Sequence, residues 1–376
     1  MTERPQPLQA LQQGHWFKLI CGASYQHQPA VRSLSLAYAL AGADCIDVAA
    51  DPAAIAAARE GVQAAQRLAP TGQPRPWLMV SLNDGDDPHF RKAEFDVTAC
   101  PPACPQPCIA ACPAEAITFQ AQAHGSAGVI AQRCYGCGRC LPVCPSQLIQ
   151  TRSYQVTPQA LSPQLASGEI DAIEIHTQVG REREFRALLS ALEPYRHCLK
   201  LLAISCPDGP QLLDYLRSLA RMVLPAPHAL IWQTDGRPMS GDIGVGTARA
   251  SLKLARKVLA GSLPGYVQLA GGTNQHTVTK LAEAGLLSGS QGNSLPPAAG
   301  IAYGSYARSL LSPVLAELEA LNQRNLDANR PYVQLEQCPQ LCERAVAQAQ
   351  ALVSQLKAAV LPPERLPAEL AAASAG

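Results

Sequence analysis

Short apolar runs alternate with longer segments of helical periodicity along most of this sequence, and this alternation limits the possible folds more than any other feature. Runs rich in Ile, Val and Leu lie at 17–24, 44–50, 77–82, 171–177, 200–205, 229–234, 266–272 and 300–305. Apolar residues recur at helical spacing in 29–41, 52–68, 158–167, 181–195, 210–223, 247–260, 275–287 and 306–321. Strands that alternate with helices in this way are typical of a parallel sheet covered by helices.

The count of eight strand-helix pairs favours a closed barrel. A chain of 376 residues is long enough for one α/β barrel plus a smaller module. We therefore predict an α/β fold whose core is a (β/α)8 TIM-barrel-like domain. The sequence does not show whether the last strand pairs with the first, so an open doubly wound α/β sheet is the alternative.

One long interruption separates the third strand from the third helix. Residues 83–157 break the alternation and contain eight of the 14 cysteines of the chain. In a barrel, the loop between a strand and the following helix lies at the C-terminal end of the strands, where binding sites are built. A module inserted at this point should therefore lie over the barrel mouth.

The second cysteine run of the insertion has a spacing known from bacterial ferredoxins. The run consists of Cys134, Cys137, Cys140 and Cys144, and Pro145 follows it. In this pattern, CxxCxxCxxxCP, three thiolates bind one iron-sulfur cluster and the fourth binds another. A second, similar run is then required.

The required run lies upstream, at Cys100, Cys104, Cys108 and Cys112, and is also followed by a proline. Its first two gaps are three residues rather than two, while the final xxxCP is the same. Four prolines lie between its first three cysteines. Because proline has no amide hydrogen, they reduce the donors available to the sulfurs, and we expect a lower reduction potential for this cluster.

The sharing rule assigns the eight cysteines to two 4Fe-4S clusters. One would be held by Cys100, Cys104, Cys108 and Cys144, and the other by Cys112, Cys134, Cys137 and Cys140. A zinc site would need CxxC pairs and would leave the repeated xxxCP endings unexplained. A radical S-adenosylmethionine site would need Cx3Cx2C. Disulfides are unexpected, because the N-terminal residues lack the basic and apolar segments of a secretory signal.

These patterns divide the chain into four expected segments. The segments are 14–95, the first part of the barrel with strands 1–3; 96–152, an inserted ferredoxin-like two-cluster domain; 153–330, the second part of the barrel with strands 4–8; and 331–376, a C-terminal helix and flexible tail.

Six further cysteines carry a weaker signal. They are Cys21, Cys45, Cys198, Cys206, Cys338 and Cys342. The first four lie in or at the ends of predicted strands and helices, where a thiol usually packs as a small apolar group. The last two are four residues apart and share one side of a helix, which is also more often packing than a metal site.

The loops after the last two strands are candidates for a phosphate or flavin-phosphate site. Gly271, Gly272, Gly304 and Ser305 occupy the positions at which barrels often bind phosphate through backbone amides. Tight turns require glycine equally well, so both interpretations stay open. Polar residues at other strand ends form no recognisable catalytic pair; they are Ser24, Asn83, Asp84, His176, Asp208, Gln233 and Asp235.

Composition excludes several classes of partner. The net charge of +1 produces no field that would attract nucleic acid or an anionic membrane. Apolar runs are all interrupted before the ~18 residues that a membrane-spanning helix needs. We expect a soluble, cytoplasmic protein.

The whole pattern resembles a known family. The proline-rich Cx3Cx3Cx3CP run, followed by CxxCxxCxxxCP within α/β sequence, is similar to the light-dependent period (LdpA) family of cyanobacteria, from about residue 14 to about residue 350. The resemblance implies a non-catalytic regulator that binds iron-sulfur clusters, responds to redox state set by photosynthetic electron flow and adjusts the circadian clock to light. It carries over the eight cysteines of the two runs as ligands and no catalytic residue.

The resemblance also implies partners and a location. It implies a protein or quinone-linked redox partner, clock-input proteins, and a cytoplasmic or peripheral thylakoid location. Two other functions compete with a sensor. One is a flavin-dependent barrel oxidoreductase, in which FMN at the mouth would exchange electrons with the clusters. The other is an accessory subunit of a photosynthetic redox complex.

Overall fold

The computed structural model describes residues 7–120, 127–224, 229–237, 241–290 and 294–360. Eight parallel strands form a closed barrel in the order β1-β12-β11-β10-β9-β8-β3-β2. They are β1 (Trp16–Gly22), β2 (Cys45–Ala49), β3 (Trp77–Asn83), β8 (Ala172–His176), β9 (Leu201–Pro207), β10 (Ala229–Asp235), β11 (Tyr266–Ala270) and β12 (Gly300–Tyr303). The predicted barrel is confirmed, and the open sheet is wrong, because β1 pairs with both β2 and β12.

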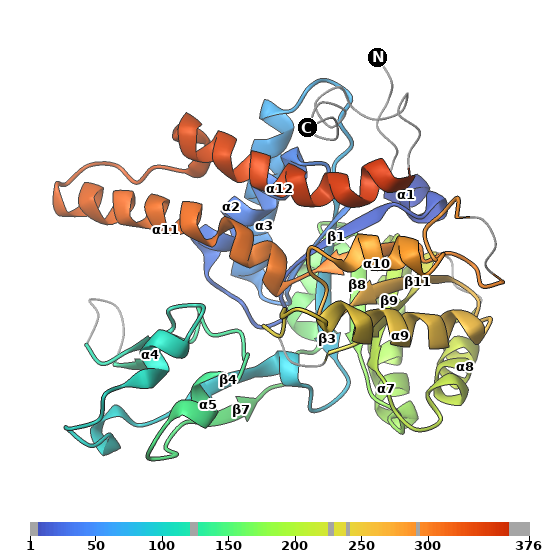
Figure 1. Cartoon of the computed structure of the whole chain (residues 1–376), viewed down its shortest axis with the longest axis horizontal. Helices are drawn as coiled ribbons and strands as arrows, with labels where there is room; N and C mark the ends of the chain where they lie inside the picture. Colours follow the sequence, from blue (N-terminus) through green and yellow to red (C-terminus); the bar gives the residue numbers. More distant parts are fainter. Residues whose placement is uncertain (1–6, 121–126, 225–228, 238–240, 291–293, 361–376) are drawn as a thin grey trace.

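Helices surround the barrel at the predicted places (Figure 1). They are α2 (Gln28–Leu40), α3 (Pro52–Leu68), η3 (Pro158–Leu161), α6 (Ser162–Ala166), α7 (Glu182–Leu192), η4 (Glu193–Cys198), α8 (Leu212–Val223), α9 (Thr247–Ala260), α10 (Thr277–Glu283) and α11 (Ser305–Asp327). The start of α3 shows how local sequence sets these limits. Asp51 accepts hydrogen bonds from the amides of Ala53 (3.0 Å) and Ala54 (2.9 Å), and Pro52 follows it.

An apolar layer fills the N-terminal end of the barrel. Its buried members are Leu11, Trp16, Cys45, Met79, Ala172, Leu201, Ala203, Ile231 and Ala299. Leu11 belongs to a short N-terminal helix, α1 (Pro7–Gln13), which the sequence patterns did not predict. This helix packs its buried side chains against the start of the strands and closes that end of the barrel.

The C-terminal part of the chain adds a helix outside the barrel. After η5 (Leu335–Gln337), α12 (Pro339–Val360) runs alongside α11 and packs on α2 (Figure 1). Two ion pairs hold η5 and α12 in place. Glu336 Oε1 of η5 lies 2.5 Å from Arg32 Nη2, and Lys357 Nζ of α12 lies 2.5 Å from the buried Asp44. The expected flexible tail at 361–376 lies outside the described residues.

The inserted module forms a separate lobe between β3 and α6 (Figure 1). Its elements are η1 (Pro88–Phe90), β4 (Arg91–Glu94), η2 (Val97–Ala99), α4 (Pro107–Ala111), β5 (Ile117–Thr118), β6 (Gly128–Val129), α5 (Cys140–Val143) and β7 (Gln150–Ser153). β4 pairs with β7, and β5 pairs with β6, both antiparallel. Each half therefore contributes one short helix and one strand to each ribbon, which is the duplicated arrangement of a ferredoxin-like fold. The module's sheet starts at residue 91, ahead of the expected boundary at residue 96.

Candidate metal centre and barrel mouth

The eight cysteines of the module form two groups of four thiols. In the outer group, the thiol of Cys100 interacts with those of Cys104, Cys108 and Cys144. In the inner group, the thiol of Cys140 interacts with those of Cys137, Cys134 and Cys112. Each group takes three cysteines from one run and the last cysteine of the other run.

The inner group surrounds a small cavity inside the module. All four of its cysteines line this cavity, together with apolar side chains that include Ile117 and Val129. Two backbone amides point at its sulfurs: Ala93 donates to Cys134 Sγ at 3.3 Å, and Ala116 donates to Cys112 Sγ at 3.2 Å. Amide donors of this kind stabilise thiolates that bind a metal or a cluster.

Cys140 of the inner group and Cys144 of the outer group have different environments. Burial raises the pKa of Cys140 to about 12, and repulsion from the neighbouring thiolates adds to this increase. Burial alone would raise the pKa of the outer Cys144. Hydrogen bonds from the amides of residues 146–149 outweigh burial, so the pKa of Cys144 lies below its usual value. Burial also raises the pKa of Cys137 in the inner group. Neighbouring thiols with raised pKa values ionise together more readily when a cation binds among them.

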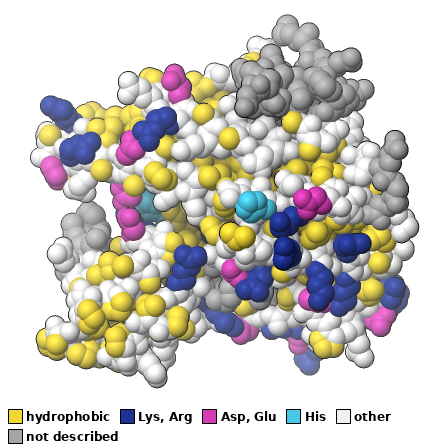
Figure 2. Space-filling model, viewed as in Figure 1, with side chains coloured by type: hydrophobic (Ala, Val, Ile, Leu, Met, Phe, Trp, Pro, Cys, Tyr) yellow, Lys and Arg dark blue, Asp and Glu magenta, His cyan; other side chains and the backbone are white. Residues whose placement is uncertain are grey.

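The outer group lies under an exposed, uncharged surface. Its exposed apolar residues flank Cys100, Cys104, Cys108 and Cys144; they are Pro101, Pro102, Ala103, Pro105, Ile109, Ala110, Pro142, Val143 and Pro145. In Figure 2 the lobe at the lower left, which holds the module, shows hydrophobic side chains and few charged ones, while Lys and Arg gather over the barrel. We call the exposed apolar residues around Cys100, Cys104, Cys108 and Cys144 the outer face.

The inner group adjoins the barrel through Tyr135. The guanidinium of Arg308 lies 4.5 Å from the centre of the Tyr135 ring, and the ring of Tyr25 meets it edge-on at 6.0 Å. Arg308 also donates to the carbonyls of Ile20 (3.0 Å) and Cys21 (3.1 Å) at the end of β1. One arginine of α11 therefore connects the module to the C-terminal end of the barrel.

Polar contacts complete this interface. Arg133 pairs with Glu319 of α11, and Arg139 donates to the carbonyl of Gly241. The amide of Gln26 donates to the carbonyl of Gln132 at 2.9 Å. The module therefore rests on the barrel mouth, as predicted for an insertion after the third strand.

The barrel interior holds a buried charged network above the apolar layer. Lys18 on β1 pairs with Glu174 on β8 and lies 3.1 Å from Asp47 on β2. Burial and repulsion from Glu174 raise the pKa of Asp47 to about 6, although Lys18 opposes them. Burial alone would raise the pKa of Glu174. The charges of Lys18 and His176 outweigh burial and lower the pKa of Glu174 to about 2.

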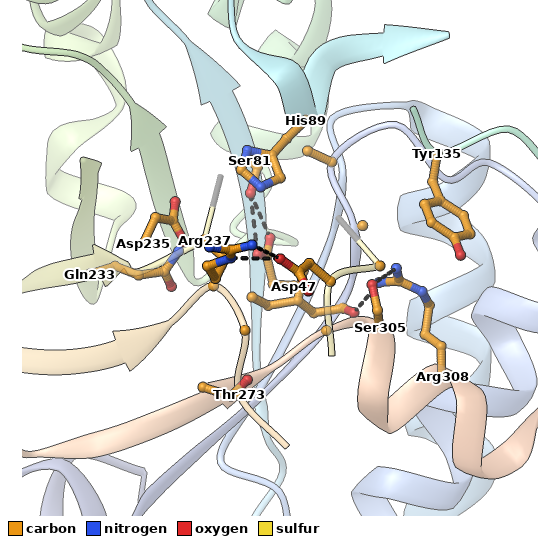
Figure 3. A pocket seen from close by; sticks show the side chains of 18 of the residues that line it. Asp47, Ser81, His89, Tyr135, Gln233, Asp235, Arg237, Thr273, Ser305 and Arg308 are labelled. Carbon is orange, nitrogen blue, oxygen red and sulfur yellow. Dashed lines mark hydrogen bonds and ion pairs between the residues drawn. The ribbon is translucent and has the colours of Figure 1, made fainter. Parts of the chain in front are cut away.

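The network continues to the barrel mouth. His176 Nε2 lies 2.9 Å from Glu174 Oε1, and Asp87 and His89 of the insertion lie beside the same imidazole. Burial alone would lower the pKa of His176, but the carboxylates of Asp87 and Glu174 outweigh it and raise that pKa well above its usual value. Figure 3 shows His89 at this mouth, with Gln233 and Asp235 on one side and Tyr135 and Arg308 on the other.

The mouth cavity has a volume of about 70 Å³. That volume holds a few water molecules or an ion, whereas small-molecule pockets usually measure about 300–1,000 Å³. Gly271, Gly272, Gly304 and Ser305 all line it, so the structure brings the predicted phosphate-site residues together. Four carboxylates also line the cavity, those of Asp47, Glu174, Asp235 and Asp242.

The fold itself requires glycine at two of these positions, whether or not a phosphate binds. A Cβ atom on Gly271 (φ +61°) would lie 2.8 Å from the amide nitrogens of Gly236 and Arg237. A Cβ atom on Gly272 (φ +90°) would lie 2.8 Å from Arg237 Cγ. Close approach of the loop after β10 therefore requires glycine at both positions.

The polar strand-end residues separate into two sets. His176, Gln233 and Asp235 line the mouth. The others stabilise loops: Ser24 donates to the His89 carbonyl, Asn83 to the Tyr154 carbonyl, Asp84 binds Arg181, and Asp208 pairs with Lys257.

Sequence reasoning missed several residues of the mouth and of the charged network next to it. Those that it missed are Lys18, Asp47, Asp87, His89, Tyr135, Glu174 and Arg308. A signal was present for three of them, because Lys18, Asp47 and Glu174 are charges inside otherwise apolar strands.

Five of the six cysteines outside the module pack as expected. Cys21, Cys45 and Cys206 are buried in barrel strands. Cys338 and Cys342 are partly buried against the core at the start of α12, and the Cys342 amide donates to the Cys338 carbonyl at 2.9 Å.

Comparison with known proteins identifies the family. The model of the LdpA Fe-S cluster-binding domain matches residues 100–155, and that of the light dependent period A C-terminal domain matches residues 164–355. "Light dependent period A" of Synechococcus elongatus is 52% identical over 354 residues, 94% of each chain. This chain belongs to the light dependent period A family.

The first family domain contains all eight cysteines of the two groups, and the second covers β8 to β12 with most of α12. Among solved structures, tryptophan synthase of M. tuberculosis in its aminoacrylate-bound form is 13% identical, with a TM-score of 0.39 over 91% of this chain and 94% of that chain. A ligand-free mutant of the same enzyme gives the same values. Among the described helices of this light dependent period A family member, none has the length and apolar character needed to cross a membrane.

Proposed function

We propose that this chain is an iron-sulfur redox sensor that binds two 4Fe-4S clusters and couples cellular redox state to light-dependent adjustment of the circadian clock. The observation that carries the proposal is the division of the eight thiols into two groups of four that exchange their last cysteine. The name of the Synechococcus elongatus relative supports the light-dependent role.

The ferredoxin-type spacing of the second cysteine run and the match to an Fe-S cluster-binding domain support clusters over zinc. Four thiolates around a tetrahedral zinc ion lie within about 3.8 Å of one another, given Zn–S bonds of about 2.3 Å. Among the described residues, which include all eight cysteines, no three sulfurs come within 4.8 Å of one another.

The protein would use its two thiol groups differently. A 4Fe-4S cluster accepts or releases one electron at a time. Cys100, Cys104, Cys108 and Cys144 would hold one cluster beneath the outer face, where a partner protein has access. Cys112, Cys134, Cys137 and Cys140 would hold the other next to Tyr135 and the barrel mouth. The expected partners are a redox donor or acceptor, either a protein or a quinone-linked component, and clock-input proteins.

The mouth gives no support to the flavin alternative. A cavity of about 70 Å³ is far smaller than a flavin ring system requires. We therefore keep the sensor as the proposed function and place FMN among the outcomes of the test.

The first test is chemical analysis of anaerobically purified protein. We expect about eight iron and about eight sulfide per chain and no released flavin, since two 4Fe-4S clusters contain that number. About four iron per chain would contradict the second cluster, and stoichiometric zinc would contradict iron-sulfur binding. Bound FMN would favour the flavin-dependent enzyme.

The second test examines the exchange of cysteines. In a variant that lacks Cys134, Cys137 and Cys140, one cluster should remain. Adding Cys144→Ala should then remove it, because that thiol belongs to the remaining group. Cys112→Ala in the same background is the matched control and should leave the iron content unchanged. The opposite pattern would refute the sharing of ligands.

The regulatory role is testable in cells. In a cyanobacterial host without its own family member, the wild-type chain should restore the dependence of circadian period on light intensity. Cys137→Ala should not restore it, because loss of one thiolate ligand removes a cluster and the folding energy that it contributes. Full restoration by Cys137→Ala would exclude the clusters from clock input.

A further inference from the structure

A second set of metal-binding side chains lies at the barrel mouth, outside the cysteine groups. Asp87, His89 and His176 each offer one donor atom, and the three atoms lie within 4.8 Å of one another. We propose that these residues bind one divalent first-row transition metal ion, separate from the iron of the clusters. The proposal does not depend on the function proposed above.

Two different parts of the fold bring the three residues together. His176 ends β8, a buried strand of the barrel. Asp87 precedes η1, and its carboxylate accepts a hydrogen bond from the amide of His89 at 2.8 Å, so the first turn of the insertion places His89 over the strand end. The two imidazole rings lie 5.1 Å apart, centre to centre.

The Nδ1 atom of His176 faces the other two residues of this set and makes no hydrogen bond. Its side chain is 7% exposed, and its Nδ1 is buried with no hydrogen-bond partner. The nearest carboxylate oxygen, Asp87 Oδ1, is 3.7 Å away, which is too far for a hydrogen bond. A buried polar atom without a partner is rare in a native protein, and a metal ion would supply the missing contact.

Glu174 holds the same imidazole in place from the other side. Its Oε1 lies 2.9 Å from His176 Nε2. A carboxylate that binds one imidazole nitrogen fixes the ring orientation and leaves the other nitrogen to the metal, as in many metalloproteins. Glu174 itself is held by Gln233, whose amide donates to it at 2.6 Å. The supporting contacts of a metal ligand are therefore already present.

The donor set indicates the class of metal. Two imidazoles and one carboxylate suit divalent ions such as Fe²⁺, Mn²⁺, Co²⁺ and Zn²⁺, whereas Ca²⁺ and Mg²⁺ prefer oxygen donors alone. His89 and His176 both line the mouth cavity of about 70 Å³. The remaining coordination positions would face this space and take water or a small ligand.

The same chain segment links this site to the inner cysteine group. Asp87 and His89 precede β4, and Ala93 of β4 donates its amide to Cys134 Sγ at 3.3 Å. An ion held by Asp87 and His89 would therefore order the strand that contacts the inner group.

The test uses Mn²⁺ as the probe, because nitrogen and oxygen donors bind it and the cluster thiolates compete poorly for it. Full-length protein with its native iron content is titrated anaerobically, and free Mn²⁺ is followed by its electron paramagnetic resonance signal. We expect one Mn²⁺ per chain. The double variant Asp87→Asn/His89→Gln should bind at least 10-fold more weakly, and His197→Gln, an exposed histidine of η4, should bind as the wild type does.

Each result decides the proposal. Binding that survives the double variant, or a wild type that binds no Mn²⁺, would show that Asp87, His89 and His176 form only an ion-pair network. His89→Gln alone provides a second variant if the double variant loses its fold, as judged by circular dichroism. Iron and sulfide content, measured on the same samples, reports separately on the cysteine groups.

Discussion

Individual side chains differ in how far the sequence predicts their roles. The cysteine groups follow from two runs in a single segment, because the cysteines of each run lie within a few residues of one another and the ferredoxin pattern exchanges the last one. Lys18 and Glu174 meet only because β1 and β8 face one another across the barrel, 156 residues apart in sequence. Charges in apolar strands signal such a network, but their partners depend on the closed barrel.

The buried His15 provides a test at this scale. Burial and the nearby Lys357 lower the pKa of His15 to about 3. Below pH ~6.5 the unfolded chain binds a proton that the folded chain excludes, so stability falls as the pH drops through this window, by about 2 kcal/mol at pH 5. His15→Gln should remove this loss, measured as the difference between the free energies of unfolding at pH 7 and pH 5. His197→Gln, at an exposed position, should retain the wild-type dependence, and equal slopes for all three proteins would contradict the assignment.

The start and end of a helix or strand could be predicted where the local sequence determines them. The bounds of α3 and α9 agree with the predicted 52–68 and 247–260. The short α1 escaped prediction because its stability depends on the end of the barrel that it covers, and a helix of 7 residues is unstable by itself. The same reasoning applies to α4 and α5, which have few residues and bury Cys108 and Cys140 in the apolar cluster of the module.

The contact between α2 and α3 gives a prediction at the scale of elements. A Cβ atom on Gly61 of α3 would lie 2.2 Å from the carbonyl oxygen of Arg32 on α2. Alanine is the better helix former by up to ~1 kcal/mol, but forcing packed helices apart costs about 1–3 kcal/mol. Gly61→Ala should therefore lower the midpoint of thermal unfolding.

Gly244→Ala is the control for this prediction, because a Cβ atom at that position meets no atom within 4 Å. It should leave the midpoint unchanged. A stabilised Gly61→Ala protein would mean that the helices have room to separate.

For the whole molecule, the place of the insertion was predictable and its docking was not. The count of strands located the module in the loop after the third strand, and the barrel geometry then placed it over the mouth. The contacts that hold it there join residues far apart in sequence, such as Tyr135 and Arg308. Their pairing has no local signal in the sequence.

Tyr135→Leu tests this docking. Loss of a cation–π contact of about 0.5–2 kcal/mol should speed amide hydrogen exchange at the interface, in residues 25–27 and 131–133, roughly 2- to 30-fold. Iron content should stay at the wild-type value, which separates loosened docking from loss of a cluster. Tyr332→Leu, at an exposed tyrosine, is the matched control, and unchanged exchange in both variants would refute a role for Tyr135 in docking.

The antiparallel pairing of β4 with β7 bears on the order in which the protein assembles in the cell. β3 and β8 are neighbours in the barrel, yet residues 84–171 separate them along the chain. Pairing of β4 with β7 shortens this connection to 84–90 and 154–171, which reduces the entropy lost when the two strands meet. Because all eight cysteines of the module lie between β4 and β7, cluster binding would favour this pairing and thereby hasten closure of the barrel.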